Sequence, residues 1–278
     1  MADLNKIDEK VVAHLESLDL KTDLFSDSVK ILENKLSKQL SEYLSTFELD
    51  KGNLVLNNAN ISKLGALQVE IEKALKKIGY DKILEELLIN FGDIDAFWKE
   101  THLEANGINI QAQQLNQIRE YFAAQVIQTA GIKGIANGLQ PLLSEVLRTS
   151  ITAQTGLLDA LKTMEAFVKS GAIQSPATRY ILTHTKDVLN QYDGVVNQKI
   201  AEAYGLDGIR YVGSILTTSR AQCKRWVKMG TIAIKDLQKE IDWAAKYGSG
   251  QNPNTTPATF NIYRGGYGCR HSSYPIRL

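Results

Sequence analysis

The feature that most constrains this chain is the helical spacing of its apolar residues. Intervals of three and four residues run through the first half in separate stripes, of which the clearest two comprise Val29, Leu32, Leu36, Leu40, Tyr43 and Phe47, then Leu67, Ile71, Leu75 and Ile78. Such spacing places all members of a stripe on one face of an α-helix. Only five prolines occur among 278 residues, so few positions are unsuited to helix. The sequence therefore predicts a fold dominated by amphipathic helices.

Glycine, proline and serine predict where the middle helices begin and end. The segment TAGIKGIANGLQP holds three glycines and a proline, which predicts a loop or hinge near residues 130–141. A long helix is expected after it, over about 142–169. A second helix should open with Ser175 as its N-cap and Pro176 in its first turn, and should run to about residue 204.

The last quarter of the chain has a different pattern. IRYVGSIL, from residue 209, is typical of a strand, and TTSRAQCKRW, from residue 217, is typical of a loop or turn. The segment IAIKDLQKEIDWAAKYG, from residue 232, predicts a short amphipathic helix. TFNIYR, from residue 259, predicts another strand. These elements together predict a small α+β module.

We therefore expect a mainly α fold, in which a multi-helix body precedes a small α+β C-terminal module. Residues 1–135 form the N-terminal helical region of this scheme, residues 136–205 form a pair of long helices, and residues 206–278 form the module. No stretch approaches the roughly 18–20 consecutive apolar residues of a membrane span. The opening MADLNKIDEK lacks the basic and apolar regions of a signal peptide, so synthesis in a reducing cytosol is expected.

Charge is distributed unevenly along the chain. Residues 209–278 carry 11 lysines and arginines against three acids, whereas the preceding residues carry 21 against 28. A basic C-terminal region suits nucleic acid or an acidic protein surface, although it could simply neutralise the acidic body. The residues predicted to make such a contact are Arg220, Lys224, Arg225, Arg264 and Arg270. Arg220, Lys224 and Arg225 lie closest together in the sequence. The alternative to nucleic-acid contact for these three is an ordinary basic turn beside a packed Trp226.

Cys223, Cys269 and His271 are the residues with the most distinctive chemistry. One interpretation is that the two cysteines pack as small buried apolar side chains and close the module. A second is a zinc site, in which water, a carboxylate or His184 supplies the fourth ligand. A third makes Cys269 a nucleophile activated by His271, and a disulfide formed later under oxidising conditions is a fourth. We expect structural closure without a cofactor, and keep zinc as the alternative.

The common sequence motifs for catalysis are mostly absent from the chain. It has no phosphate-binding Gly-x-x-x-x-Gly-Lys-Ser/Thr loop, no His-Glu-x-x-His and no Gly-x-Ser-x-Gly. We therefore expect no enzyme activity and identify no small-molecule substrate. There are two alternative functions. One is a zinc-stabilised module that binds nucleic acid, and the other is an effector enzyme that uses Cys269 and His271.

An ordered set of short motifs resembles the phage Mu F-like minor head protein family, which includes head-morphogenesis proteins of tailed bacteriophages. The segments that carry the resemblance are Ala177-Thr178-Arg179, YVGSILTTSRAQC (211–223), Gly230 and GYGCRHSSYPI (266–276). Most weight lies on the turn from Ser219 to Cys223 and on the Gly-Cys-Arg-His sequence that begins at Gly268. The chain departs from the family pattern at His184-Thr185-Lys186, where many members have Arg-Thr-Glu. It also ends the signature in Cys-Arg-His instead of Cys-Arg-Cys.

The resemblance implies a structural role in a virion. Members of the family enter the phage head in few copies, associate with the portal vertex, and assist head assembly and DNA packaging or delivery. It implies portal and capsid proteins as partners, and location in the host cytoplasm during assembly.

Overall fold

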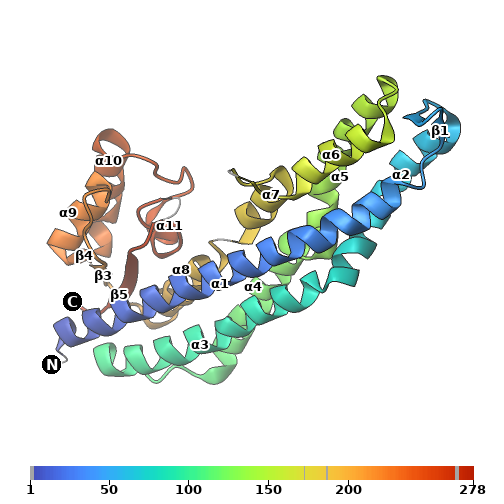
Figure 1. Cartoon of the computed structure of the whole chain (residues 1–278). Coiled ribbons are helices and arrows are strands. Elements are labelled where there is room, and N and C mark those ends of the chain that lie inside the picture. The colour runs from blue at the N-terminus through green and yellow to red at the C-terminus, as the bar shows by residue number, and fades with distance from the viewer. Residues whose placement is uncertain (1–2, 172, 186, 267–268) are drawn as a thin grey trace. The chain divides into compact units, whose positions relative to one another are not determined.

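The structure is a computed structural model, and it describes residues 3–171, 173–185, 187–266 and 269–278 (Figure 1). It is mainly α-helical, as the sequence predicts. The chain divides into two compact units, of which unit 1 contains residues 1–22, 89–122 and 187–278, and unit 2 contains residues 23–88 and 123–186. Three helices contribute residues to both units: α1 (Leu4–Leu44), α3 (Tyr80–Asn106) and α4 (Ala112–Ala130).

The two units do not coincide with the three consecutive regions expected from the sequence. All of residues 206–278 lie in unit 1, together with residues 1–22 and 89–122 from the expected N-terminal region. The units could not be predicted from consecutive sequence regions, because each unit is built from stretches that are far apart in the chain.

Unit 2 consists of helices and one short hairpin. Besides its parts of α1, α3 and α4, it contains α2 (Asn58–Ile78), α5 (Ile132–Thr152), α6 (Leu157–Val168) and α7 (Pro176–Thr185), with the hairpin strands β1 (Leu49–Asp50) and β2 (Asn53–Leu54). Of the predicted stripe at residues 67–78, Leu67, Ile71 and Leu75 are buried on α2 and Ile78 is half-buried; α2 packs along α5. The predicted start of α7 is also confirmed, since the Thr178 amide donates to Ser175 Oγ at 3.1 Å.

The prediction of a loop or hinge at residues 130–141 is wrong. Helix α5 begins at Ile132 and continues through Pro141, which lies inside it. Glycine costs a helix about 1 kcal/mol and proline about 3 kcal/mol. The helix nevertheless buries an apolar stripe comprising Ile135, Leu139, Leu143, Leu147 and Ile151. Each such side chain contributes about 1.5–3 kcal/mol on burial, so packing outweighs the local preference.

One glycine of the expected hinge has a specific packing role. A Cβ atom at Gly138 would lie 1.7 Å from the hydroxyl oxygen of Tyr180 on α7. Glycine at this position therefore permits the close approach of α5 and α7 within unit 2.

Each of the two long helices expected at about 142–169 and 175–204 is divided. The first breaks between α5 and α6, where Gln154 has φ +49° and the amide of Leu54 donates to the Thr155 carbonyl. The second divides into α7 and α8 (Val188–Tyr204).

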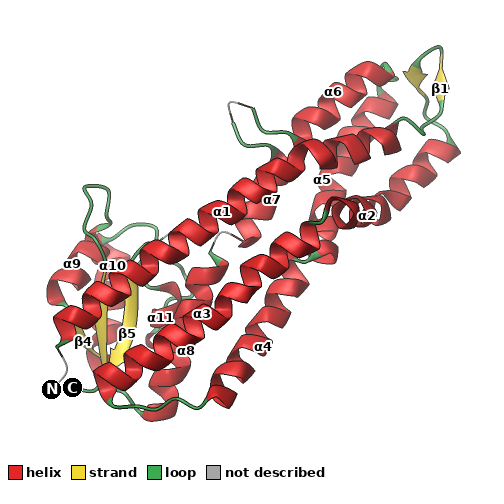
Figure 2. Ribbon diagram, turned by 60° about the horizontal axis from the view of Figure 1, so that its bottom comes forward, coloured by secondary structure: helices red, strands yellow, loops and turns green. Residues whose placement is uncertain are grey.

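Unit 1 contains the small sheet. Its strands, drawn in yellow in Figure 2, are β3 (Gly208–Val212), β4 (Thr231–Ala233) and β5 (Ser272–Ile276). They are arranged in the order β4-β3-β5 with both pairs antiparallel. Its short helices are α9 (Ala221–Met229), α10 (Leu237–Tyr247) and the one-turn α11 (Phe260–Tyr263). Helices and sheet bury one apolar cluster, made by Ile209, Tyr211, Trp226, Ile232, Leu237, Ile241, Ala244 and Phe260.

Two local predictions in this region are wrong. TTSRAQCKRW was expected to be a loop, but α9 begins within it, because Gln222, Cys223 and Trp226 face the interior at helical spacing. TFNIYR was expected to be a strand, but it forms α11, preceded by a capping box between Thr256 and Thr259. The strand at 209 and the helix within 232–248 are confirmed.

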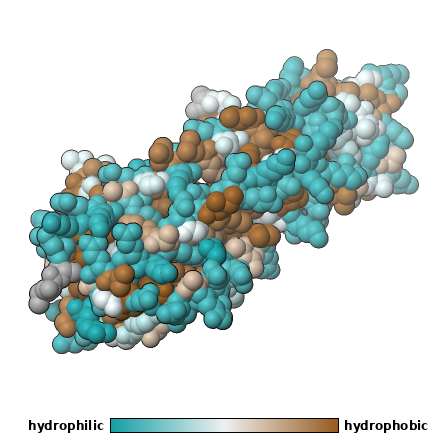
Figure 3. Space-filling model, turned by 90° about the horizontal axis from the view of Figure 1, so that it is seen from below, coloured by the Kyte–Doolittle hydropathy of each residue, from teal (hydrophilic) through white to brown (hydrophobic). Residues whose placement is uncertain are grey.

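The surface is mostly polar on the face that Figure 3 shows, where brown apolar areas are separated by teal ones. None of the helices in the described part of the chain has the length and apolar character needed to cross a bilayer.

Candidate functional site

The structure brings Cys223, Cys269 and His271 together in unit 1. Cys223 lies in the first turn of α9, and the other two lie just before β5. The Cys223 and Cys269 sulfur atoms are 3.8 Å apart, and His271 Nδ1 lies 3.6 Å from the Cys269 sulfur. Both cysteines are free thiols, so the structure contains no disulfide between them.

Tyr211 and Gly265 complete the surroundings of this cluster. The Tyr211 hydroxyl lies 3.6 Å from the Cys223 sulfur and 3.5 Å from the Cys269 sulfur. Its ring stacks on the His271 ring, with centroids 5.8 Å apart. A Cβ atom at Gly265 would lie 2.3 Å from the Cys223 sulfur and 2.9 Å from the Cys269 sulfur, so only glycine fits between them.

The two thiols titrate as a pair. The hydrogen bond with Cys223, together with His271 and Tyr211, lowers the pKa of Cys269 well below that of a free thiol. The hydrogen bond to Cys269, burial and the charge of a Cys269 thiolate raise the pKa of Cys223. One proton therefore leaves the pair readily, whereas the second is retained unless a cation offsets the charge.

Arg264 is not available for contact with DNA, contrary to the prediction. Its side chain is buried, with only 2% of the residue exposed, and lies 2.8 Å from Asp193 Oδ2 in an ion pair. The guanidinium also donates to the carbonyl oxygens of Asn190, Asn261 and His271. Sequence analysis could not distinguish this arginine from an exposed one, because its partner lies 71 residues earlier in the chain.

Asp193 is the centre of a buried polar network that the sequence did not reveal. Besides Arg264, it accepts hydrogen bonds from Trp98 Nε1 at 2.6 Å and Ser272 Oγ at 3.2 Å, and it lies 3.1 Å from His14 Nε2. Burial by itself would raise the pKa of this carboxyl, but the Arg264 charge and the hydrogen bonds hold the pKa below its ordinary value. The network ties α1, α3, α8 and the segment before β5 together.

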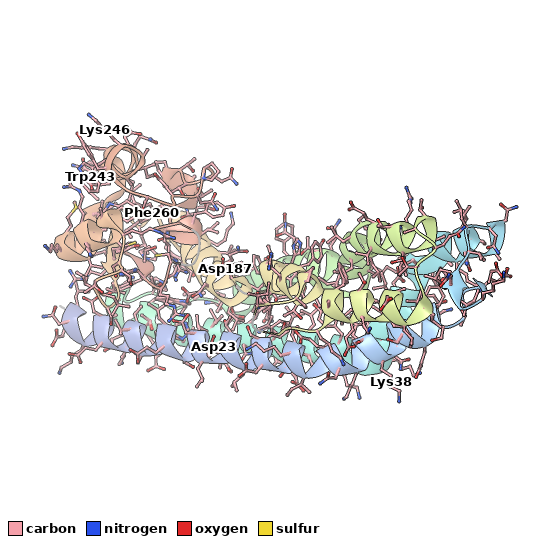
Figure 4. The ribbon with its side chains drawn as sticks, turned by 45° about the horizontal axis from the view of Figure 1, so that its top comes forward. Asp23, Lys38, Asp187, Trp243, Lys246 and Phe260 are labelled. Carbon is pink, nitrogen blue, oxygen red and sulfur yellow. The ribbon has the colours of Figure 1, made fainter. Side chains whose placement is uncertain are left out.

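Two further predicted contact residues have internal partners. Arg225 donates two hydrogen bonds to the carboxylate of Glu240 on α10, at 2.7 and 2.9 Å, and lies over the Trp243 ring. Lys224 donates to the Thr217 carbonyl at 2.9 Å. Trp243 and Lys246 mark α10 in Figure 4. Arg225 therefore helps to hold α9 against α10, as in the structural alternative for the basic patch.

Arg220 and Arg270 line the same surface depression as the cysteine–histidine cluster. Arg220 donates to the Gly265 carbonyl at 2.9 Å. The Arg270 side chain is 67% exposed and lies 3.6 Å from Asp19 of α1. The rest of the depression is lined by Ser214, Leu216, Thr218 and Ser219.

The motifs that carry the family resemblance are only partly brought together. The turn at 219–223 meets the Cys269–His271 segment at the cluster, and Gly230 adopts φ +67° while its carbonyl accepts from Tyr211. Gly268 of the signature and Lys186 of the departure lie outside the described residues. The residues from Ala177 to Arg179 belong to unit 2, as does His184, and His184 is not part of the cluster.

Comparison of the chain with known protein families, with curated proteins and with solved structures finds no match. The family resemblance therefore depends on the signature residues alone.

Proposed function

We propose that this chain is a non-catalytic structural protein of a phage virion: a minor head component, associated with the portal vertex, that assists head assembly and DNA packaging or delivery. The observation that carries the proposal is the meeting of the two main signature segments. They are separated by 46 residues in sequence, yet Cys223 and Cys269 lie in contact. The two segments that carry most of the resemblance thus meet within unit 1.

The surroundings of the cluster favour a structural role for it. Gly265 lies against both sulfurs, and Tyr211 contacts them from β3. The ion pair of Arg264 with Asp193 holds the segment that follows Arg264. These contacts attach the last strand to the rest of unit 1. A side-chain cluster embedded in this way supports closure of the fold.

Exposed apolar side chains supply a surface for a protein partner. Leu24 and Ile31 are 59% and 67% exposed on α1 and are seven residues apart, so they lie on one face of the helix. Portal or capsid proteins are the partners that this function implies. Packaged DNA is a further partner. Arg220, Lys224 and Arg270 remain as its contact residues, because Arg264 is buried and Arg225 pairs with Glu240.

The test is quantitative mass spectrometry of particles purified from cells that carry the gene and produce phage. We expect the chain in mature particles, in few copies relative to the major capsid protein, and cross-linked to the portal. A chain present in the cytosol of these cells but absent from their particles would refute the assignment.

Variants of α1 test the partner surface. Replacing Leu24 and Ile31 together by serine should reduce incorporation into particles without altering helix content. The matched control is Leu158→Ser, which changes a residue of similar exposure, 74%, on α6. Equal incorporation of the double variant and the control would exclude this face as the partner surface.

A further inference from the structure

The cysteine–histidine cluster has the dimensions of a tetrahedral metal site. Zinc lies about 2.3 Å from a cysteine sulfur and about 2.0–2.1 Å from a histidine nitrogen. Tetrahedral angles then separate two sulfur ligands by about 3.8 Å, and a sulfur from a nitrogen by about 3.6 Å. The observed separations are 3.8 Å between the sulfurs and 3.6 Å between the Cys269 sulfur and His271 Nδ1. The third separation, between the Cys223 sulfur and a ring nitrogen of His271, is at most 4.8 Å.

We propose that Cys223, Cys269 and His271 bind a zinc ion, with Sγ, Sγ and Nδ1 as the ligand atoms. This proposal is independent of the virion function, because the geometry of the three side chains carries it alone. Two thiolates and one imidazole form a ligand set that favours zinc over magnesium or calcium, which prefer oxygen ligands.

The alternative states of the cluster explain less of its geometry. A disulfide needs a sulfur–sulfur distance of about 2.05 Å, which is far shorter than the separation of these atoms. Packing of two thiols as apolar groups gives no reason for the imidazole of His271 to face them. That ring is buried, and its other nitrogen, Nε2, has no hydrogen-bond partner in the described structure. The hydrogen-bond partner that the structure gives this ring is the Cys269 sulfur, at Nδ1.

Neighbouring residues suit the charged form of the cluster. The Tyr211 hydroxyl is within reach of both sulfurs and can donate a hydrogen bond to a metal-bound thiolate, which orients the ligand. Gly265 leaves space beside the two sulfurs that any side chain would fill.

Cys223, Cys269 and His271 line one surface depression together with Ser219, Arg220 and Arg270, so solvent has access to the cluster. The cluster holds three residues with ligand atoms among those described, and His184 belongs to the other unit. Water is accordingly the fourth ligand, as in zinc sites that have three protein ligands.

The test uses the full chain, reduced and stripped of metal by a chelator, with Co²⁺ as a spectroscopic probe and Zn²⁺ as its competitor. We expect one Co²⁺ per chain, with a thiolate-to-cobalt charge-transfer band and the intense visible bands of tetrahedral cobalt. Zn²⁺ should abolish both and should protect the two thiols from alkylation. A folded wild-type chain that gives no such bands, and whose thiols Zn²⁺ does not protect, overturns the proposal.

Variants identify the ligands. Cys223→Ser, Cys269→Ser and His271→Asn should each remove the charge-transfer band or weaken binding strongly, whereas the control His184→Asn should leave it unchanged. Tyr211→Phe should retain the bands and bind more weakly, by about 10–100-fold, as expected for a residue that orients ligands. If a cysteine variant fails to fold, alkylation of the wild-type chain decides the matter. Unaltered bands in a folded His271→Asn variant would exclude His271 as a ligand and overturn the proposed site.

Discussion

His102 makes unit 1 sensitive to acid, and the size of the effect follows from its surroundings. The residue is fully buried on α3, between neutral partners: Nδ1 accepts from the Asn106 amide at 3.0 Å, and Nε2 lies 3.1 Å from Asn197 Oδ1. Asn197 Nδ2 donates to the Asp193 carbonyl, so its oxygen faces the imidazole as an acceptor. These bonds fix the neutral tautomer that carries its proton on Nε2. A proton on Nδ1 would then oppose the Asn106 amide.

Burial therefore lowers the pKa of His102 from 6.5 to about 4. Because the unfolded chain binds this proton first, the stabilising contribution is present above pH 6.5 and is lost as the pH falls toward 4. The difference between the pKa of His102 in the unfolded and the folded chain corresponds to about 3.4 kcal/mol of folding stability. About 2 kcal/mol of this stability is lost between pH 7.5 and pH 5.

The assay is urea denaturation of wild type and His102→Gln at pH 7.5 and pH 5, followed by tryptophan fluorescence. Trp98 lies close to the His102 ring, with centroids 5.6 Å apart, so it reports on this region. Glutamine can keep both hydrogen bonds but does not titrate. The free energy of unfolding should fall by about 2 kcal/mol more in the wild type than in the variant. Equal decreases would refute the reasoning, since all other titrating groups are shared.

Three further predictions concern packing, the buried ion pair and charge. Arg264→Ala should lower the free energy of unfolding by about 3–5 kcal/mol, because it leaves the Asp193 carboxylate buried without its partner. The control Arg270→Ala should change the free energy of unfolding by less than about 1 kcal/mol. Similar losses for the two variants in denaturant titrations would contradict the prediction. Gly138→Ala should reduce the melting temperature by forcing α5 away from Tyr180, and the added variant Tyr180→Ala should restore part of the loss; no loss in calorimetry would show that the two helices can separate freely. If the basic region contacts DNA, affinity for a short duplex should fall steeply with salt and should weaken in Arg270→Glu, whereas salt-independent binding, or none at low salt, would rule the contact out.

The helical part of the fold could largely be predicted from the sequence, because periodicity and capping are local properties. The stripe on α2 and the cap at Ser175 required no knowledge of distant residues. The expected hinge at 130–141 failed for the opposite reason. Glycine and proline disfavour helix locally, but the burial of five side chains on α5 depends on neighbours that the local pattern does not show.

The cysteine–histidine cluster was only partly predictable. The spacing of Cys269 and His271 indicated that they could be neighbours, and Cys223 was grouped with them for its chemistry alone. The structure shows that α9 brings the Cys223 sulfur to 3.8 Å from that of Cys269. The hydroxyl of Tyr211 and the close approach of Gly265 gave no sequence signal. Arg264 appeared equivalent to the other basic residues, because its burial depends on a carboxylate from a distant helix.

The network centred on Asp193 also sets an order in which the chain can complete its fold during synthesis. All residues of unit 2 have been made once residue 186 leaves the ribosome, so that unit can form early. Unit 1 must wait, because its first 22 residues and α3 share Asp193 with Arg264 and Ser272. Until Arg264 arrives, burying that carboxylate is unfavourable. The apolar face of the first turns of α1 is therefore covered late, after most of the chain has been made.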